Sequence, residues 1–288
     1  MWTYLPATVG LAGLLASSAG ALTITTRSRA VAPGEIVIVT IASNAVLPKP
    51  NVRVFERDLA PFAVDERTWR VLVGIDIDAG TGKHVLTVEA GAERATHTLV
   101  VAPKTFPTRR LTVDEAFVNP PEAARARIEE ESKLVAAIWN ASPPDRLWDG
   151  PFIRPVPHPA NSAFGTRSIF NGQRRSAHGG ADFLSPAGTP VKAPNAGKVV
   201  LVRNLYYSGT TVIIDHGLGV LSYFAHLSEP TVAEGDTVAA GVVVGKVGAT
   251  GRVTGPHLHW TLRVSGARVD PLALLTLLGA PARGETRR

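Results

Sequence analysis

The first hundred residues alternate between short apolar runs and turn residues. Glu35–Ile41 is rich in β-branched side chains, and Leu22–Thr25 alternates apolar and polar positions. Pro33-Gly34 and Ala79–Gly82 are turn signals between such runs. Several short strands at regular spacing are typical of a β-sandwich. We therefore predict an immunoglobulin-like β-sandwich over residues 22–102, with strands at 22–25, 35–41, 51–55, 69–75, 84–88 and 97–101.

The pattern changes to helical spacing in the next segment. Asn119 can cap a helix, Pro120 fits a first helical turn, and apolar residues then recur on one stripe as far as about Trp139. Pro143 and its neighbour end that pattern, and later prolines keep the chain extended. We predict a connector over residues 103–160 that contains one helix.

Strand patterns return after the connector, and each apolar run is again bounded by Gly or Pro. A short helix is predicted only near Leu272–Leu278. We therefore predict that the chain is mostly β, with a second, antiparallel β domain over residues 161–288. Its predicted strands are 198–202, 210–215, 220–226, 242–247 and 257–264.

The amino-terminal stretch Leu5–Ala16 is apolar and uncharged, and an A-x-A sequence follows at Ala19–Ala21. Such a stretch is typical of a secretory signal peptide and is short for a membrane span. We predict a signal peptide over residues 1–21 and an exported protein, with the periplasm preferred over an extracellular or wall-associated location. No Lys or Arg precedes Arg27, so an uncleaved anchor or a buried strand is the alternative. No later stretch has the roughly 20 apolar residues of a membrane helix, so we expect no span after signal removal.

Composition narrows the chemistry. The 288 residues include no Cys, which excludes disulfides, Cys-ligated zinc, iron–sulfur clusters and thiol catalysis. The net charge of +6 favours an anionic partner such as nucleic acid, a membrane surface or a cell-wall polymer. The basic residues are scattered and no aromatic–basic motif accompanies them, so we predict no nucleic-acid partner.

Histidines gather in the second β domain. His178 and Asp182 bound the sequence HGGAD, His226 ends YFAH, and His257 and His259 lie in GPHLHW. On a strand, residues two apart point to the same face, so the last two histidines project together. Imidazole and carboxylate are zinc ligands, and a site with three protein ligands leaves a position for water or substrate. Together the motifs predict a metal site.

Residues 164–272 resemble the catalytic domain of the lysostaphin-type (LytM-domain) zinc endopeptidases, which cut peptide bonds in bacterial peptidoglycan. The most specific match is the run GATGRVTGPHLHW at Gly248–Trp260. The other matching segments are Phe164–Arg167, His178–Phe183, Gly188–Val191, Ala196–Val199, His216–Gly217, Tyr223–Leu227 and Gly235–Val238.

The resemblance implies roles by position. It implies that one Zn²⁺ is held by three ligands and flanked by two catalytic histidines that are not ligands. It also implies a small antiparallel β domain with an open groove and the metal on its floor. Thr261 stands where the family often has an acidic residue, at a position that is not a ligand. The implied ligands are His178, Asp182 and His259, and the implied catalytic residues are His226 and His257.

These observations predict an exported zinc metalloendopeptidase that hydrolyses crosslink or stem peptides of peptidoglycan. Zinc-activated water would be assisted by the two histidines, and which of them is the base stays open. The expected partners are peptidoglycan peptides, with a protein regulator left open. The alternative function is a non-catalytic wall-binding regulator of another peptidoglycan hydrolase. Ser185 has no paired base, so a serine hydrolase is not supported, and we interpret His216 as structural.

Overall fold

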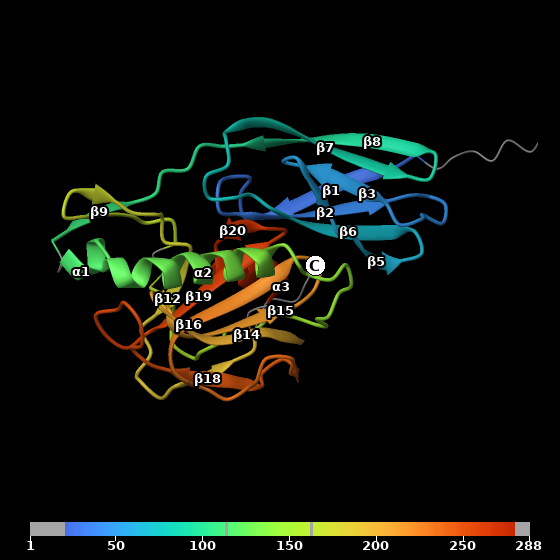
Figure 1. Cartoon of the computed structure of the whole chain (residues 1–288). Coiled ribbons are helices and arrows are strands. Elements are labelled where there is room, and N and C mark those ends of the chain that lie inside the picture. The colour runs from blue at the N-terminus through green and yellow to red at the C-terminus, as the bar shows by residue number, and fades with distance from the viewer. Residues whose placement is uncertain (1–20, 113–114, 162–163, 280–288) are drawn as a thin grey trace, which may run out of the picture.

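The computed structural model describes residues 21–112, 115–161 and 164–279 (Figure 1). Residues 1–20 of the predicted signal peptide lie outside the described residues. The described chain is mostly β with antiparallel sheets, as predicted, and a long helix runs across the second β region (Figure 1). None of the described helices combines the length and the apolar character that crossing a membrane requires.

The amino-terminal region forms two four-stranded antiparallel sheets that share one core. Every strand predicted there is present. Strands β4 and β5 were not predicted, because they are short and carry few buried apolar residues. The immunoglobulin-like assignment stays a prediction. One sheet has the order β1 (Thr23–Ser28), β2 (Ile36–Ala42), β6 (Thr68–Gly74) and β5 (Phe62–Asp65), and the other has the order β4 (Arg57–Leu59), β3 (Asn51–Val54), β7 (Gly82–Ala90) and β8 (Glu93–Val101).

Strand β2 is buried on both faces. Val37 and Val39 point into the core between the two sheets. Ile36 and Ile38 point the other way and belong to the core of the second β region. At Gly74 of the neighbouring strand β6, a Cβ atom would lie only 2.5 Å from the Val264 carbonyl oxygen. The two β regions therefore pack closely through a continuous apolar interface.

A nine-stranded antiparallel sheet forms the second β region. Its main path has the order β12-β19-β16-β15-β14-β17, and β13, β18 and β20 pair at its margins. All five strands predicted here are present within a few residues. The strands are β12 (Gly180–Phe183), β13 (Pro190–Lys192), β14 (Gly197–Leu205), β15 (Gly209–Asp215), β16 (Val220–Pro230), β17 (Thr237–Val238), β18 (Val243–Val247), β19 (Leu258–Val264) and β20 (Ala267–Val269).

The connector contains two helices rather than the one predicted. Helix α1 spans Glu115–Val118 and helix α2 spans Glu122–Trp139. The prediction that Asn119 caps the long helix was wrong, because its backbone N–H bonds to the Glu115 carbonyl and Pro121 is the N-cap. A residue before proline is disfavoured in the helical region, so the two successive prolines delay the helix start. The predicted carboxy-terminal helix is confirmed as α3 (Pro271–Leu278).

A small three-stranded sheet joins the connector to the second β region. It has the order β11 (Gln173–Arg174), β10 (Arg167–Phe170) and β9 (Thr108–Leu111). Strand β9 pairs in parallel with β10, so the chain on both sides of α2 is tied together. Strands β10 and β11 of this sheet lie directly before the HGGAD sequence in the chain.

Helix α2 packs on one face of the large sheet (Figure 1). Its residues Leu134, Val135, Ile138 and Trp139 contact a cluster that includes Leu221 and Tyr223 of β16. The Trp139 ring lies 5.9 Å from the Tyr223 ring and 5.1 Å from the guanidinium of Arg263. Tyr223 is the register partner of Thr261, so this is also the face on which Thr261 and its i±2 neighbours on β19 lie. The helix therefore covers part of the face that carries His259.

Candidate metal centre

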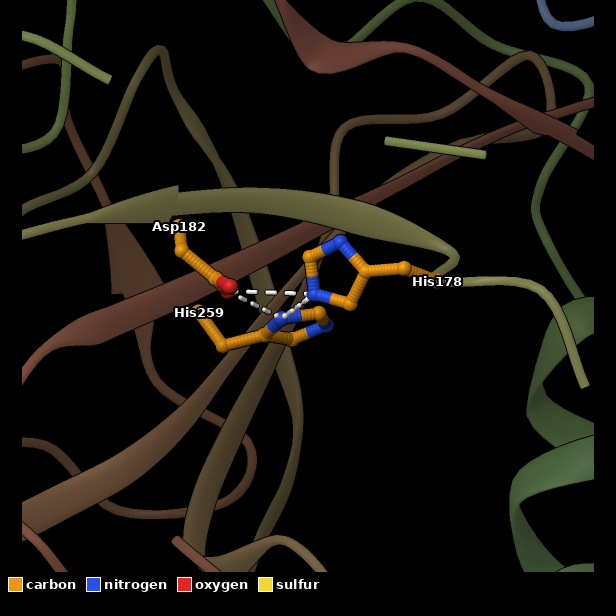
Figure 2. A group of neighbouring side chains, drawn as sticks. All are labelled: His178, Asp182 and His259. Atoms are coloured by element: carbon orange, nitrogen blue, oxygen red, sulfur yellow. Dashed lines mark hydrogen bonds and ion pairs between the residues drawn. The ribbon is translucent and has the colours of Figure 1, made fainter. Parts of the chain in front are cut away.

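Two adjacent strands and the segment before them bring His178, Asp182 and His259 together (Figure 2). We call these three residues the metal triad. Asp182 on β12 is the register partner of His259 on β19, so their side chains share a face. His178 is held just before β12 by backbone hydrogen bonds to Thr166 and from Gly165. Residues 81 positions apart in the chain thus meet at one point.

The donor atoms of the metal triad are spaced slightly closer together than the ligands of a bound zinc ion. Asp182 Oδ1 lies 2.9 Å from His259 Nδ1 and 3.1 Å from His178 Nε2. The two ring nitrogens are 3.0 Å apart. Ligands bound tetrahedrally to zinc at about 2.0–2.1 Å lie about 3.3 Å from one another. Small outward movements of the side chains would therefore let all three donors bind one ion, and the residues fit zinc.

The electrostatics of the site favour the ligand forms of Asp182 and His259. Burial disfavours the charged form of Asp182, but hydrogen bonds and charge from the two histidines hold the pKa of its carboxyl well below the usual range. Burial lowers the pKa of His259, which favours the neutral ring. An ionised carboxylate and neutral imidazoles are the forms that bind metals.

The other two predicted residues, His226 and His257, lie beside the metal triad. We call them the histidine pair. Their ring centroids are 4.9 Å apart, and His257 Nε2 lies 3.9 Å from Asp182 Oδ1. His226 Nδ1 donates to the Thr250 carbonyl and His257 Nδ1 donates to the Gly255 carbonyl, each at 2.9 Å. The Nε2 atom of each ring therefore carries a lone pair that can accept a proton.

His226 has an unusual backbone conformation, and its burial favours the neutral ring. It adopts a left-handed backbone conformation with φ of 63°, which is uncommon for a residue other than glycine. Burial lowers its pKa to about 4, so the ring is neutral at neutral pH. Thr250, whose carbonyl holds this ring, also donates its hydroxyl to the Leu227 carbonyl and accepts the Thr210 N–H. Sequence analysis missed Thr250, although its place in the matching run GATGRVTGPHLHW was a signal.

Gly180 leaves the space that the His259 ring occupies. A Cβ atom on Gly180 would lie 2.8 Å from Cε1 and 2.9 Å from Nε2 of that ring, and 2.5 Å from the Trp260 carbonyl oxygen. At Gly179 a Cβ atom would meet nothing within 4 Å. Of the two glycines in HGGAD, the second is therefore the one that the site requires.

The structural interpretation of His216 agrees with its position. The ring is fully buried, and its nitrogens lie 2.8 Å from the Ala196 carbonyl and 2.9 Å from the Ser222 hydroxyl. Burial lowers its pKa to about 4. Both nitrogens are engaged within the fold, so His216 is a core residue.

Comparison with known proteins places this site in a family. The model of peptidase family M23 matches residues 176–271, the span that contains the metal triad and the histidine pair. A crystal structure described as that of a peptidase M23 from Pseudomonas aeruginosa is 33% identical, with a TM-score of 0.70 over 85% of this chain and 95% of that one. The chain therefore belongs to peptidase family M23, which confirms the resemblance predicted from its motifs.

Two curated relatives match the same region. The peptidoglycan DD-endopeptidase ShyA of Vibrio cholerae serotype O1 is 44% identical over 100 residues, which are 35% of this chain and 23% of the relative. Lysostaphin of Staphylococcus staphylolyticus is 36% identical over 115 residues, which are 38% of this chain and 24% of the relative. The matches thus span about a quarter of the length of these relatives. Family membership supports a hydrolase that acts on peptide bonds.

Proposed function

We propose that this protein is an exported zinc endopeptidase that hydrolyses peptide bonds of bacterial peptidoglycan. The observation that carries the proposal is the convergence of the metal triad and the histidine pair on one face of the sheet. The names of the relatives, a peptidoglycan DD-endopeptidase and lysostaphin, support the substrate class. Export is supported by the apolar stretch and A-x-A sequence before residue 22.

The metal triad supplies two imidazole nitrogens and one carboxylate oxygen. A bound Zn²⁺ would provide a Lewis acid for the scissile carbonyl and lower the pKa of a bound water. Three protein ligands leave a position for that water, as in catalytic zinc sites. Asp182 and His259 are held by their place on adjacent strands, because the register of β12 and β19 fixes their separation, and His178 lies just before β12.

The histidine pair is suited to move protons at this site. Because each Nδ1–H donates to a backbone carbonyl, each ring is fixed in one orientation with Nε2 free to accept. One ring takes the proton of the attacking water. The other, once it carries an additional proton on Nε2, would donate a hydrogen bond to the developing oxyanion or protonate the leaving amine. The pair would thus divide the acid and base work without serving as ligands.

The domain arrangement is part of the same proposal. We assign catalysis to residues 161–288, with residues 22–102 and the connector 103–160 as accessory parts. Helix α2 packs on the sheet face that carries the metal triad, so the connector limits the space open to substrate on that face.

Mass spectrometry of muropeptides tests the proposal. Purified protein is incubated with peptidoglycan from several sources, with zinc, with chelator, and with chelator followed by zinc. Cleaved peptide crosslinks or stems should appear only when zinc is present. His257→Ala should release no product while it still binds zinc, since this residue is not a ligand. Zinc-loaded wild-type protein that binds peptidoglycan and cuts none of these substrates would refute the enzyme and favour the regulator.

A further inference from the structure

His259 differs from the other histidine of the metal triad in the surroundings of its second ring nitrogen. His259 Nδ1 faces the triad, and its Nε2 lies 2.8 Å from Thr261 Oγ1. The second nitrogen of His178 is buried with no hydrogen-bond partner among the described residues. Thr261 therefore contacts the His259 nitrogen that does not face the triad. The corresponding nitrogen of His178 has no such contact among the described residues.

The proton inventory of an imidazole gives this contact a consequence. A neutral ring has one N–H, and its other nitrogen offers a lone pair. When Nδ1 of His259 binds a metal, the proton must lie on Nε2, where it points at the hydroxyl oxygen of Thr261. The hydroxyl accepts that proton and so favours the tautomer in which Nδ1 is a ligand.

The strands on either side hold this contact in place. Strand β19 runs between β12 and β16, and Thr261 is the register partner of Gly180 on one side and of Tyr223 on the other. Gly180 has no side chain, and the Cε1–Nε2 edge of the His259 ring occupies the space that a Cβ would need. The ring thus lies between a glycine that admits it and a hydroxyl that fixes its rotation.

We propose that Thr261 is a positioning residue of the metal centre, whose hydroxyl orients the His259 ring and selects its metal-binding tautomer. The inference rests on the proposed metal site and extends it to a residue that contributes no ligand atom. Outer partners of metal-bound histidines typically change metal affinity about 10–100-fold when they are removed. Loss of the Thr261 hydroxyl should therefore weaken metal binding while the fold persists.

Two substitutions separate the hydroxyl from the shape of the side chain. Thr261→Val removes Oγ1 and keeps the β-branched form that suits a strand. Thr261→Ser keeps the hydroxyl and removes the methyl group. The full chain and both variants are stripped of metal, and their folds are compared by circular dichroism and thermal unfolding. Zn²⁺ affinity is then measured against a chromophoric chelator, and the absorption spectrum of the Co²⁺ form reports the geometry of the ligands.

We expect Thr261→Val to bind Zn²⁺ about 10–100-fold more weakly and to alter the Co²⁺ spectrum. Thr261→Ser should bind close to wild type with an unaltered spectrum. Wild-type affinity in a folded valine variant would overturn the role of Thr261 and leave the proposed zinc enzyme standing. Zn²⁺ binding by a folded serine variant about 10-fold or more weaker than wild type would overturn it as well, and this test holds even if the valine variant does not fold. A wild-type protein that binds no zinc would overturn both proposals.

Discussion

Removing the ion pair between Asp76 and Arg268 tests most directly how the two β regions are joined. Asp76 follows β6 of the amino-terminal region, and Arg268 lies on β20 of the second. The guanidinium donates to both carboxylate oxygens, at 2.6 and 3.1 Å, and the Arg268 backbone N–H donates to Oδ2 at 2.9 Å. Asp76→Asn removes the charge and keeps the shape of the side chain.

The pKa of Asp76 sets how much Asp76→Asn should lower the free energy of unfolding. Burial disfavours its ionised form, but the hydrogen bonds and charge of Arg268 hold the pKa at about 2, below the ordinary 3.8. At about 1.4 kcal/mol per pKa unit, ionised Asp76 stabilises the fold by about 2 kcal/mol. The folded pKa is depressed, so this stability is present above the unfolded value, near pH 4, and is lost as the pH falls toward 2. Roughly half should be gone by pH 3.

Denaturant unfolding at pH 7, 4 and 3 measures this effect. Asp76→Asn should lower the free energy of unfolding by about 2 kcal/mol at pH 7, and its difference from wild type should narrow in acid. Asp78→Asn is the matched control, because Asp78 pairs with the same arginine at 2.8 Å but its side chain is 51% exposed, against 19% for Asp76. The control should cost less than about 1 kcal/mol. The reasoning would be refuted if both variants lost the same free energy of unfolding at pH 7. It would also be refuted if the difference between wild type and Asp76→Asn did not narrow in acid.

Two further substitutions, each with a matched control, test the packing around the site. Gly180→Ala should weaken zinc binding and cost about 1–3 kcal/mol of stability, because its Cβ would lie 2.5 Å from the Trp260 carbonyl oxygen. Gly179→Ala, which meets nothing within 4 Å, should leave zinc titration and thermal unfolding unchanged, and equal effects of the two would contradict this. Trp139→Ala should lower the unfolding free energy by about 1–3 kcal/mol in denaturant, because the ring packs α2 onto the sheet. Lys133→Ala on the exposed side of α2 should change it by less than about 0.5 kcal/mol, and a similar loss in both would argue against this docking.

The elements that the sequence predicted correctly are those with a strong local signal. The run Glu35–Ile41 is apolar at nearly every position, and it forms a strand buried on both faces. The motif HLH places two histidines on one face, and Leu258 between them is fully buried, as strand alternation requires. The five predicted site residues come together because HGGAD, YFAH and HLH lie on or beside three strands that are neighbours in the sheet.

The features that sequence analysis missed depend on contacts between distant segments. The run around Ile38 indicated a buried strand, but it did not indicate that the second face of this strand packs against the second β region, whose first large-sheet strand begins at Gly180. The short strand β4 carries polar side chains and exists because it pairs with β3. Sequence analysis noted Thr261 only as a departure from the family pattern, because its contact with His259 depends on the rotation of that imidazole ring. The start of α2 was misplaced because Asn119 is a good capping residue, but two prolines follow it.

Zinc stoichiometry tests the central claim most directly. The full chain, Asp182→Ala and His257→Ala are purified with zinc, dialysed together and analysed for metal per chain. Wild type and His257→Ala should each retain one zinc ion, because the triad is intact in both. Asp182→Ala should retain none, because the carboxylate that faces both ligand histidines is gone. Zinc retained at one ion per chain in Asp182→Ala, or lost from a folded His257→Ala, would contradict the assignment of the metal triad.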